Sequence, residues 1–268
     1  MEPTEIANLV DKLKLVAEAK EDGVDLTPNL VALTHERAVK CLVGKIFASR
    51  VVNREALRTH RPQILQIRSD FEIEIVGDNL FLIAFSSLAD RRHTLFHGPW
   101  HFFQSLLLFK EPKGFQKPSE VCFDEFSIWV QCHNIPISCM DPVIIRKIGE
   151  KLGRVEEVDM GEGGSCMGMY ARVRVIREVN TPLRRCIPLN ATDSPNGELI
   201  LLRYERLHDF CYACGRVTHT IRECTDENAD KKNLMFGCWL RAGRTKDVRR
   251  KKTNESKDAA QTIGIVLQ

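Results

Sequence analysis

The chain has 268 residues, of which 43% are hydrophobic and 28% charged, a composition typical of one or two folded domains with a sizeable core. Its net charge of +3 is mild and does not by itself indicate a nucleic-acid partner. There is no run of 18 apolar residues, and Met1–Glu5 lacks the basic start of a secretory signal, so we expect no membrane span and a nuclear and/or cytoplasmic protein that is not secreted.

The first half of the chain alternates between helical and extended patterns. Apolar residues from Ile6 to Ala17 recur at helical spacing, which predicts an amphipathic helix followed by a linker at 22–29. The apolar stripe of this helix fits either pairing with another chain or packing on its own domain. We then predict strands at 41–47, 71–75, 80–85 and 101–109, and helices at 53–65 (broken near Pro62) and 88–96. The resulting order, β-α-β-β-α-β, is the ferredoxin-like α+β arrangement.

A second α+β unit is predicted at 120–206. Its expected elements are strands at 126–133, 155–159, 170–179 and 199–206, and a helix at 142–152 with Pro142 in its first turn. Gly161–Gly164 lacks the Lys-Ser/Thr of a phosphate-binding loop and is predicted to form a bend.

Four residues after this unit have the spacing of metal ligands. Cys211, Cys214, His219 and Cys224 form the pattern Cys-x2-Cys-x4-His-x4-Cys. Three thiolates and an imidazole satisfy the tetrahedral preference of Zn²⁺, and four strong ligands close the site against catalysis. In a chain without an export signal, cysteines are expected as thiols or metal ligands rather than disulfides. The pattern therefore predicts a structural zinc site.

The same segment carries residues suited to nucleic acid. Zinc knuckles recognise single-stranded nucleic acid with an apolar or aromatic platform for the bases and cations for the phosphates. Tyr212 and Ile221 are the predicted platform, and Arg216 and Arg222 are the predicted cations. The alternative is that Tyr212 and Ile221 only cover the zinc.

A second candidate surface lies on the predicted strands of the second unit. Trp129, Tyr170, Arg172 and Arg174 would share one sheet face if the strands that carry them are neighbours. Faces of this kind stack bases in RRM-like modules, although the RRM sequence signature is absent. The alternative is that a helix or the first domain covers this face.

The C-terminal end is cationic. Between Lys231 and Lys252 there are nine Lys or Arg residues and one acid, Asp247. Arg249, Arg250, Lys251 and Lys252 fit a phosphate-binding arm, a nuclear-import patch or a solvated end.

Two other groupings invite a functional interpretation. His93, His97 and His101 recur at intervals of four, but no Glu follows His93 and Gly98-Pro99 breaks the helix, so we expect packed or solvated rings. Cys132-His133 suggests a nucleophile and a base, yet neighbours on a strand point to opposite faces. No enzyme site is predicted.

Short segments along the chain resemble a known plant family. They are Leu42–Lys45, Gly77–Leu82, Gly98–Phe102, Ile128–Gln131, Asn134–Pro136, Lys147–Gly153, Pro182–Arg185, Tyr204–Leu207, Phe210–Tyr212 and Phe236–Ala242. Together they resemble the family that carries the domain of unknown function DUF4283 followed by a zinc knuckle. Its members look like the gag-like first-frame proteins of plant LINE-type retrotransposons and their host-resident relatives.

The patterns above and this resemblance, which covers about residues 36–242, together predict a domain plan and a function. We expect an N-terminal helix and linker at 1–28, a DUF4283-like domain at 36–112, the second unit at 120–206, the knuckle at 207–226 and a basic, largely disordered tail at 227–268. The implied function is non-catalytic, zinc-dependent binding of single-stranded nucleic acid, RNA more than DNA, with possible self-association and no small-molecule substrate. The alternative is an assembly module in which the knuckle is a structural staple. The family usually has Gly before the knuckle His, where this chain has Thr218, which is expected to strain the turn.

Overall fold

The computed structural model describes residues 25–53, 55–57, 59, 65, 67, 69–160, 166, 168–190 and 197–243. The predicted helix at 6–17, the Gly161–Gly164 bend, most of the predicted helix at 53–65 and the cations at 249–252 lie outside these residues. No helix among the described residues has both the length and the apolar character needed to cross a membrane. The chain divides into two compact units, with the boundary between Lys40 and Cys41.

The described part of the first unit contains one helix, α2 (Pro28–Val39). Thr27 precedes it in extended conformation, and Pro28 occupies the first turn, where its missing N–H is not needed. This helix was not predicted, because residues up to 29 had been assigned to a linker. The Thr27-Pro28 pair was the available start signal.

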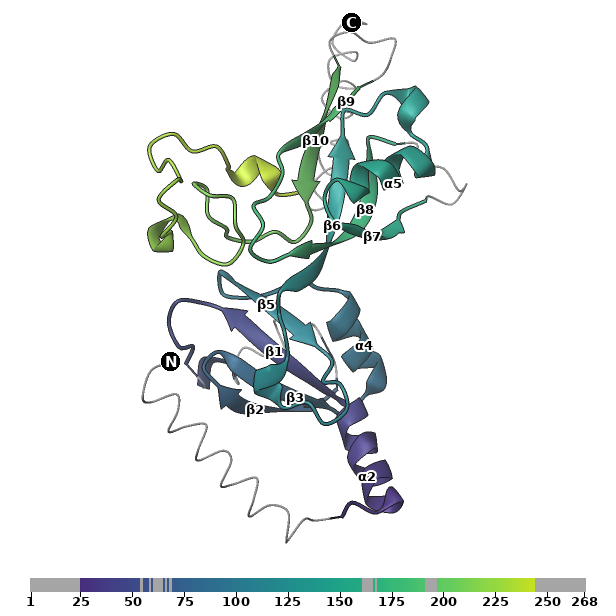
Figure 1. The fold of residues 1–268 in the computed structure, drawn as a ribbon, viewed down its shortest axis with the longest axis vertical. Helices are drawn as coiled ribbons and strands as arrows, with labels where there is room; N and C mark the ends of the chain where they lie inside the picture. The colour runs from purple at the N-terminus through teal and green to yellow at the C-terminus, as the bar shows by residue number, and fades with distance from the viewer. Residues whose placement is uncertain are drawn as a thin grey trace, which may run out of the picture. The chain divides into compact units, whose positions relative to one another are not determined.

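The second unit begins with a five-stranded antiparallel sheet, sheet A (Figure 1). Its strands are β1 (Cys41–Phe47), β2 (Phe71–Gly77), β3 (Leu80–Phe85), β4 (Trp100–Phe102) and β5 (Ser105–Lys110). They lie in the order β2-β3-β1-β5-β4, and α4 (Leu88–Phe96) connects β3 to β4. The first strand is therefore central, between β3 and β5, as the split β-α-β-β-α-β order requires.

One predicted strand of this sheet is in fact a hairpin. Residues 101–109 were expected to form a single strand, but the chain turns between β4 and β5, with Phe102 opposite Ser105. Phe103 takes a φ of 52°, the positive value that a two-residue hairpin turn needs. Because Phe stands where Gly or Asn usually marks such a turn, the run appeared to be uninterrupted.

A second five-stranded antiparallel sheet, sheet B, follows in the same unit. Its strands are β6 (Glu125–His133), β7 (Arg154–Val158), β8 (Tyr170–Glu178), β9 (Cys186–Leu189) and β10 (Glu198–Tyr204), in the order β7-β8-β6-β10-β9. The short edge strand β9 was not predicted, since its four residues include Pro188, which is tolerated only at such an edge. The α+β class is as predicted, and the structure adds that each of the two sheets has five antiparallel strands.

Helix α5 (Pro142–Glu150) covers one face of sheet B, packing on β7 and β8 (Figure 1). The Asp141 carboxylate accepts a 2.8 Å hydrogen bond from the Val143 N–H and begins the helix. Ile145 and Ile148 point into the core, which also contains Val43 from β1. Both sheets thus contribute to one hydrophobic cluster within this unit. Four short 3-10 helices complete the described elements: η1 (Pro118–Glu120), η2 (Ile137–Cys139), η3 (Ile221–Glu223) and η4 (Cys238–Leu240).

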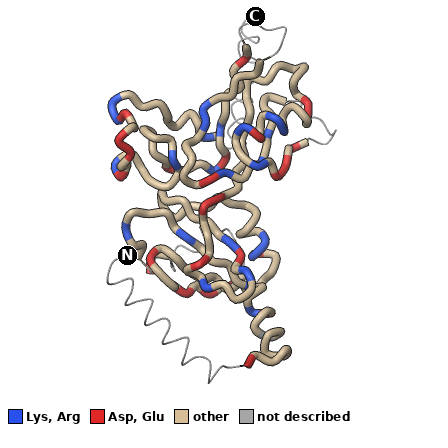
Figure 2. The backbone as a smooth tube through the Cα atoms, viewed as in Figure 1, with Lys and Arg blue, Asp and Glu red and all other residues tan. Residues whose placement is uncertain are grey.

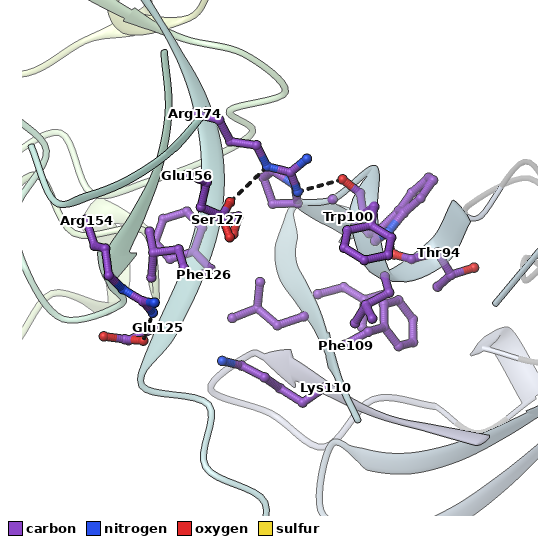
Figure 3. A pocket seen from close by; sticks show the side chains of 17 residues that line it. Thr94, Trp100, Phe109, Lys110, Glu125, Phe126, Ser127, Arg154, Glu156 and Arg174 are labelled. Atoms are coloured by element: carbon purple, nitrogen blue, oxygen red, sulfur yellow. Dashed lines mark hydrogen bonds and ion pairs between the residues drawn. The ribbon is translucent and has the colours of Figure 1, made fainter. Parts of the chain in front are cut away.

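Charge is interspersed rather than gathered by sign along this unit (Figure 2). Charges of both signs also line a cavity of about 240 Å³, whose walls include Arg154 and Arg174 as well as Glu125 and Glu156 (Figure 3). Arg174 pairs with Glu156 at 3.1 Å, and Arg154 lies 3.6 Å from Glu125. These cations are therefore already partnered within the protein.

Candidate metal centre and nucleic-acid interface

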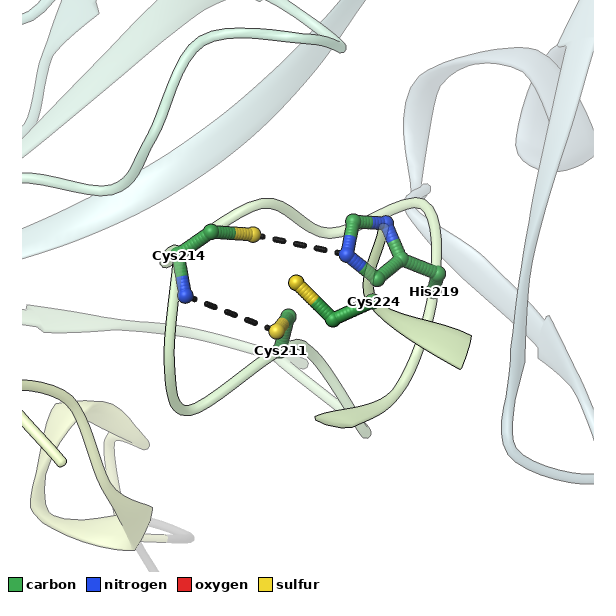
Figure 4. A group of neighbouring side chains, drawn as sticks. All are labelled: Cys211, Cys214, His219 and Cys224. Carbon is green, nitrogen blue, oxygen red and sulfur yellow. Dashed lines mark hydrogen bonds between the residues drawn. The ribbon is translucent and has the colours of Figure 1, made fainter. Parts of the chain in front are cut away.

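The side chains of Cys211, Cys214, His219 and Cys224 converge on one point (Figure 4). Their candidate ligand atoms all lie within 4.8 Å of one another. The three cysteines are buried and His219 is half-buried. A tetrahedral ion with ligands at about 2.0–2.3 Å fits among atoms at this separation.

Backbone hydrogen bonds shape the loop around the first two cysteines. The Gly215 N–H donates to the Cys211 carbonyl at 2.8 Å, and the Cys211 N–H donates to the Arg216 carbonyl at 2.9 Å. Gly215 has a φ of +76°, which a residue without Cβ adopts at little cost. Helix η3 then leads into Cys224, and the Glu223 carboxylate accepts the Thr220 N–H at 3.0 Å to fix the start of that turn.

His219 is held with one ring nitrogen toward the sulfurs. Its Nε2 lies 3.4 Å from the Cys214 Sγ, while its Nδ1 lies 3.0 Å from the Thr218 hydroxyl oxygen. Thr218 is not among the residues of positive φ, so the expected strain from replacing glycine is absent. That expectation was wrong: the threonine is accommodated and supplies a polar partner to the imidazole.

Burial and neighbouring groups shift the pKa values of the ligand side chains in different directions. Burial raises the pKa of the Cys214 thiol to about 12. The pKa of Cys224 is lowered: burial opposes this shift, but hydrogen bonds from the Asp226 N–H and from the other two thiols outweigh it. Burial and the nearby Arg216 lower the pKa of His219, which keeps its ring neutral, as a ligand must be.

Comparison with known families agrees with this geometry. Residues 34–115 match the domain of unknown function DUF4283, and residues 191–226 match a zinc knuckle. The chain carries a DUF4283 domain followed by a zinc knuckle. The ion that this Cys3His cluster binds is Zn²⁺.

Two individual proteins are similar to parts of the chain. An uncharacterized protein of Arabidopsis thaliana is 31% identical over 97 residues, which are 36% of this chain and 31% of that protein. The match thus spans less than a third of the relative. The crystal structure of the first two RRM domains of the yeast poly(U) binding protein aligns with 61% of this chain and 98% of its own, at 12% identity and a TM-score of 0.21. At that score the likeness carries no weight for function.

Backbone hydrogen bonds attach the zinc knuckle to the segment between β8 and β9 and to the segment that follows the knuckle. The Leu183 N–H donates to the Gly215 carbonyl at 2.9 Å, and the Phe236 N–H donates to the Tyr212 carbonyl at 3.2 Å. Val217, inside the knuckle, is buried in the same hydrophobic cluster as the core of sheet B. The knuckle is therefore packed against the rest of this unit and is not an independent module tethered by a linker.

The segment after the knuckle completes this docking. Phe236 packs so closely on Gly215 that a Cβ there would lie 2.5 Å from its ring. Leu240 is buried, and the Ala242 N–H donates to the Tyr204 carbonyl at 2.9 Å. These contacts fall in the first part of the tail that was expected to be basic and largely disordered at 227–268. No local pattern marks these long-range contacts in the sequence.

The knuckle residues predicted to contact nucleic acid differ in how accessible they are to it. Arg222 is exposed. Arg216 instead pairs with the Asp226 carboxylate at 3.0 Å and donates to the Asn180 carbonyl at 2.9 Å. Ile221 is half-buried against the ligand cluster, so it covers the zinc at least in part.

Tyr212 contributes to the docking of the knuckle as well. Its ring is half-buried and meets Phe210 edge-on, with centroids 4.9 Å apart. It also packs against the hydrophobic cluster of sheet B. Only part of this ring is accessible to a base.

On sheet B, β6 and β8 are neighbours, so the four predicted residues do share a face. Two of its cations are nevertheless committed within the protein. Arg172 lies over the Trp129 ring at 4.3 Å and pairs with Glu205 at 2.8 Å and Asp159 at 2.6 Å. Arg174 donates to the Phe96 carbonyl at 2.7 Å in addition to its pair with Glu156. Phe96 belongs to the DUF4283 domain, so this domain contacts the face at Arg174.

The histidine series is packed, as expected. His93 and His97 stack at 4.3 Å, whereas His101 stacks on His208 at 3.7 Å. Burial, followed by the nearby His208, Arg206 and Arg241, lowers the pKa of His101 to about 2. Among the described residues only the knuckle forms a cluster of three or more candidate metal ligands.

Proposed function

We propose that this protein binds single-stranded nucleic acid, RNA in preference to DNA, through its zinc knuckle and without catalysing a reaction. The observation that carries the proposal is the closed Cys3His centre with the exposed Arg222 inside its loop. Knuckles use such loops to hold unpaired bases and adjacent phosphates. Four strong protein ligands leave no open position on the zinc for a substrate.

The cellular setting belongs to the same proposal. The pairing of a DUF4283 domain with a knuckle supports a gag-like protein related to plant retrotransposons, acting in the nucleus and/or cytoplasm. Zinc binding requires reduced thiols, and none of the ten cysteines forms a disulfide in the structure.

Filter binding of single-stranded RNA across a salt series tests the proposal, with single-stranded DNA and duplex RNA of the same sequence as comparisons. Affinity should be highest for single-stranded RNA and should fall steeply with salt, because phosphate contacts release counterions. Stripping the zinc should weaken binding. Absence of binding at low salt with zinc present would end the proposal.

A second candidate function is assembly, with the knuckle as a structural staple. The contacts of Gly215 with Leu183 and Phe236 favour it, since they show the knuckle holding other segments in place. Light scattering of the full chain, compared with a chain lacking residues 1–28, tests self-association through the predicted N-terminal helix. If both are monomeric at about 10–100 μM, a range where weak complexes form, self-assembly through this helix is excluded.

A further inference from the structure

The outer face of sheet B, away from α5, carries a row of side chains that no family match assigns. Leu201 on β10 lies opposite His133 on β6, which in turn lies opposite Tyr170 on β8. The residues beside them in the chain, such as Cys132, Ala171 and Leu202, are buried in the core. Because neighbours on a strand alternate between faces, the row points away from the core.

The β10 end of this row is open. Leu201 is 49% exposed, and Leu199 on the same strand face is 52% exposed. His133 and Tyr170 are half-buried, with ring centroids 5.0 Å apart. The two rings, tilted by 38° to one another, lie beside an exposed leucine, and aromatic faces of this kind are those on which bases stack.

A cation lies next to the row. Arg203 is exposed, and it follows Leu201 by two residues on the same face of β10. Two strand residues span about 6.6 Å, a distance within reach of the phosphate joined to a stacked base. Burial and the positive Arg203 lower the pKa of His133, so its ring is neutral at pH 7 and stacks without repelling that cation.

The carboxylate nearest to this cation along the strand is already engaged. Glu205 accepts hydrogen bonds from Gln131 at 2.7 Å and from Arg172 at 2.8 Å. Glu205 and Asp159 share Arg172, and Arg203 forms no ion pair with a carboxylate among the described residues, so its cation can meet an external anion. The surface is thus complementary to a polymer, such as single-stranded nucleic acid, in which flat rings alternate with negative charges.

The row is also connected to the zinc knuckle. Cys186 on β9 lies opposite Leu201, and the adjacent Arg185 donates to the Met235 carbonyl at 3.3 Å and lies 5.7 Å from the Phe236 ring. Phe236 in turn packs on the knuckle. A single strand of nucleic acid bound at the knuckle can therefore cross β9 to reach this row of side chains.

We propose that His133, Tyr170 and Leu201 form a base-stacking surface for single-stranded nucleic acid, with Arg203 meeting its phosphates. This inference rests on the proposed function but places a second contact site beyond the knuckle. It also moves the sheet contact away from Trp129, Arg172 and Arg174, of which the two arginines are held by internal ion pairs and Trp129 lies under Arg172.

The test is affinity for a single-stranded RNA long enough to cover knuckle and sheet, measured for Tyr170→Ala, Tyr170→Phe, Leu201→Ala and Arg203→Gln. Tyr170→Ala should bind about fivefold to 150-fold more weakly, the effect of one lost base stack, while Tyr170→Phe keeps the ring and most of the affinity. Arg203→Gln should reduce the salt slope by about 0.7, one phosphate contact on a single strand. Val143→Ala, which is on α5 over the opposite face and 63% exposed, should change nothing.

Zinc content and circular dichroism show whether each variant is folded, and photo-crosslinking of 4-thiouridine RNA locates the contact without any substitution. Crosslinks to β6 or β8 support the inference. If the wild type binds and Cys214→Ser weakens it, but the sheet variants bind normally and crosslinks stay in the knuckle, only this inference fails. If the wild type binds no RNA, both proposals fail. If the protein forms an oligomer and Leu201→Ala dissociates it, the row is a protein–protein contact and the inference is overturned.

Discussion

At the scale of single residues, the knuckle shows how a departure from a family pattern can take on a role. With Nε2 of His219 facing the sulfurs, the proton of a neutral ring is on Nδ1, 3.0 Å from the Thr218 oxygen. Partners of this type fix the tautomer and orientation of a zinc-bound histidine. A glycine at this position would offer no side-chain oxygen.

Thr218→Val therefore tests a contribution to zinc affinity. The substitution keeps the shape and removes the hydroxyl, so we expect zinc to bind about 10-fold to 100-fold more weakly, as for other losses around a metal ligand. Thr218→Ser retains the oxygen and should stay near wild type. Competition against a chromophoric chelator measures both. Equal zinc affinities for the valine and serine variants would show that the hydroxyl does not contribute to zinc binding.

His101 provides a second prediction at this scale. Its folded-state pKa is about 2, and an unfolded histidine titrates near the ordinary 6.5. Below pH 6.5 the unfolded chain binds a proton that the folded chain does not, so stability is lost as pH falls from about 6.5 toward 2. The loss at pH 5.5 is about 1.4 kcal/mol.

His101→Phe removes this titration and keeps a ring to stack on His208. Urea unfolding at pH 7.5 and pH 5.5 should show a smaller difference for the variant than for the wild type, by about 1 kcal/mol. His35→Phe, at an exposed position of α2, is the control and should retain the wild-type difference. The account is wrong if His101→Phe and wild type lose the same stability on acidification.

At the scale of elements, a glycine in the middle of β1 lets two strands pack their aromatic rings. Gly44 pairs with Phe81 on β3 and with Phe109 on β5, and the two rings meet edge-on over it at 5.9 Å. A Cβ at Gly44 would lie 2.4 Å from the Phe81 ring. The cost of glycine in a strand is thereby offset by the aromatic contact it permits.

Gly44→Ala should therefore destabilise the protein, by about 1–3 kcal/mol, because the rings must move to make room. Gly77→Ala is the matched control in β2, since its Cβ would meet nothing closer than 3.6 Å; we expect a change within about 0.5 kcal/mol. Urea unfolding midpoints at constant m-value measure both effects. An alanine at position 44 that leaves the midpoint unchanged would show that the rings repack freely.

How well the elements could be predicted depended on whether local signals mark their ends. The predicted bounds of β1, β3 and α4 agree with the structure. The Gly77-Asp78-Asn79 turn marks the start of β3, and Ser87 caps the start of α4. The hairpin of β4 and β5 was missed because Phe103 carries the positive φ, and β9 because four residues are too few to show a period. The spacing of the cysteines and histidine indicated the metal cluster without any fold.

At the scale of the whole molecule, the contacts missed in the sequence are those between distant segments. Arg172 and Arg174 have the alternation of a binding face, but their partners Glu205 and Phe96 are far away in the chain. The row of Leu201, His133 and Tyr170 likewise depends on strand register, which the periodicity of one strand cannot give. Which cations are free is a property of the folded molecule.

The docked knuckle and the cations at 249–252 are expected to divide the work of binding. Cys214→Ser removes one thiolate from the zinc, and metal binding supplies the folding energy of so short a loop. Base stacking on the knuckle, worth about 1–3 kcal/mol per base, should then be lost. The cations at 249–252 need no fold to attract phosphates. Cys214→Ser should therefore lower zinc content and affinity while leaving the salt slope nearly unchanged.

Replacing Arg249, Arg250, Lys251 and Lys252 with Gln should do the reverse. Each lost phosphate contact flattens the slope of log affinity against log salt by about 0.7 on a single strand, whereas zinc content stays at the wild-type level because the ligands are untouched. Cys238→Ser, at an exposed cysteine outside the cluster, controls for loss of a thiol and should change neither quantity. Zinc and affinity are measured for each variant across the same salt series. Should Cys214→Ser keep full zinc and full affinity, the ligand assignment itself would be refuted, because a closed tetrahedral site cannot lose a thiolate without weakening its hold on the ion.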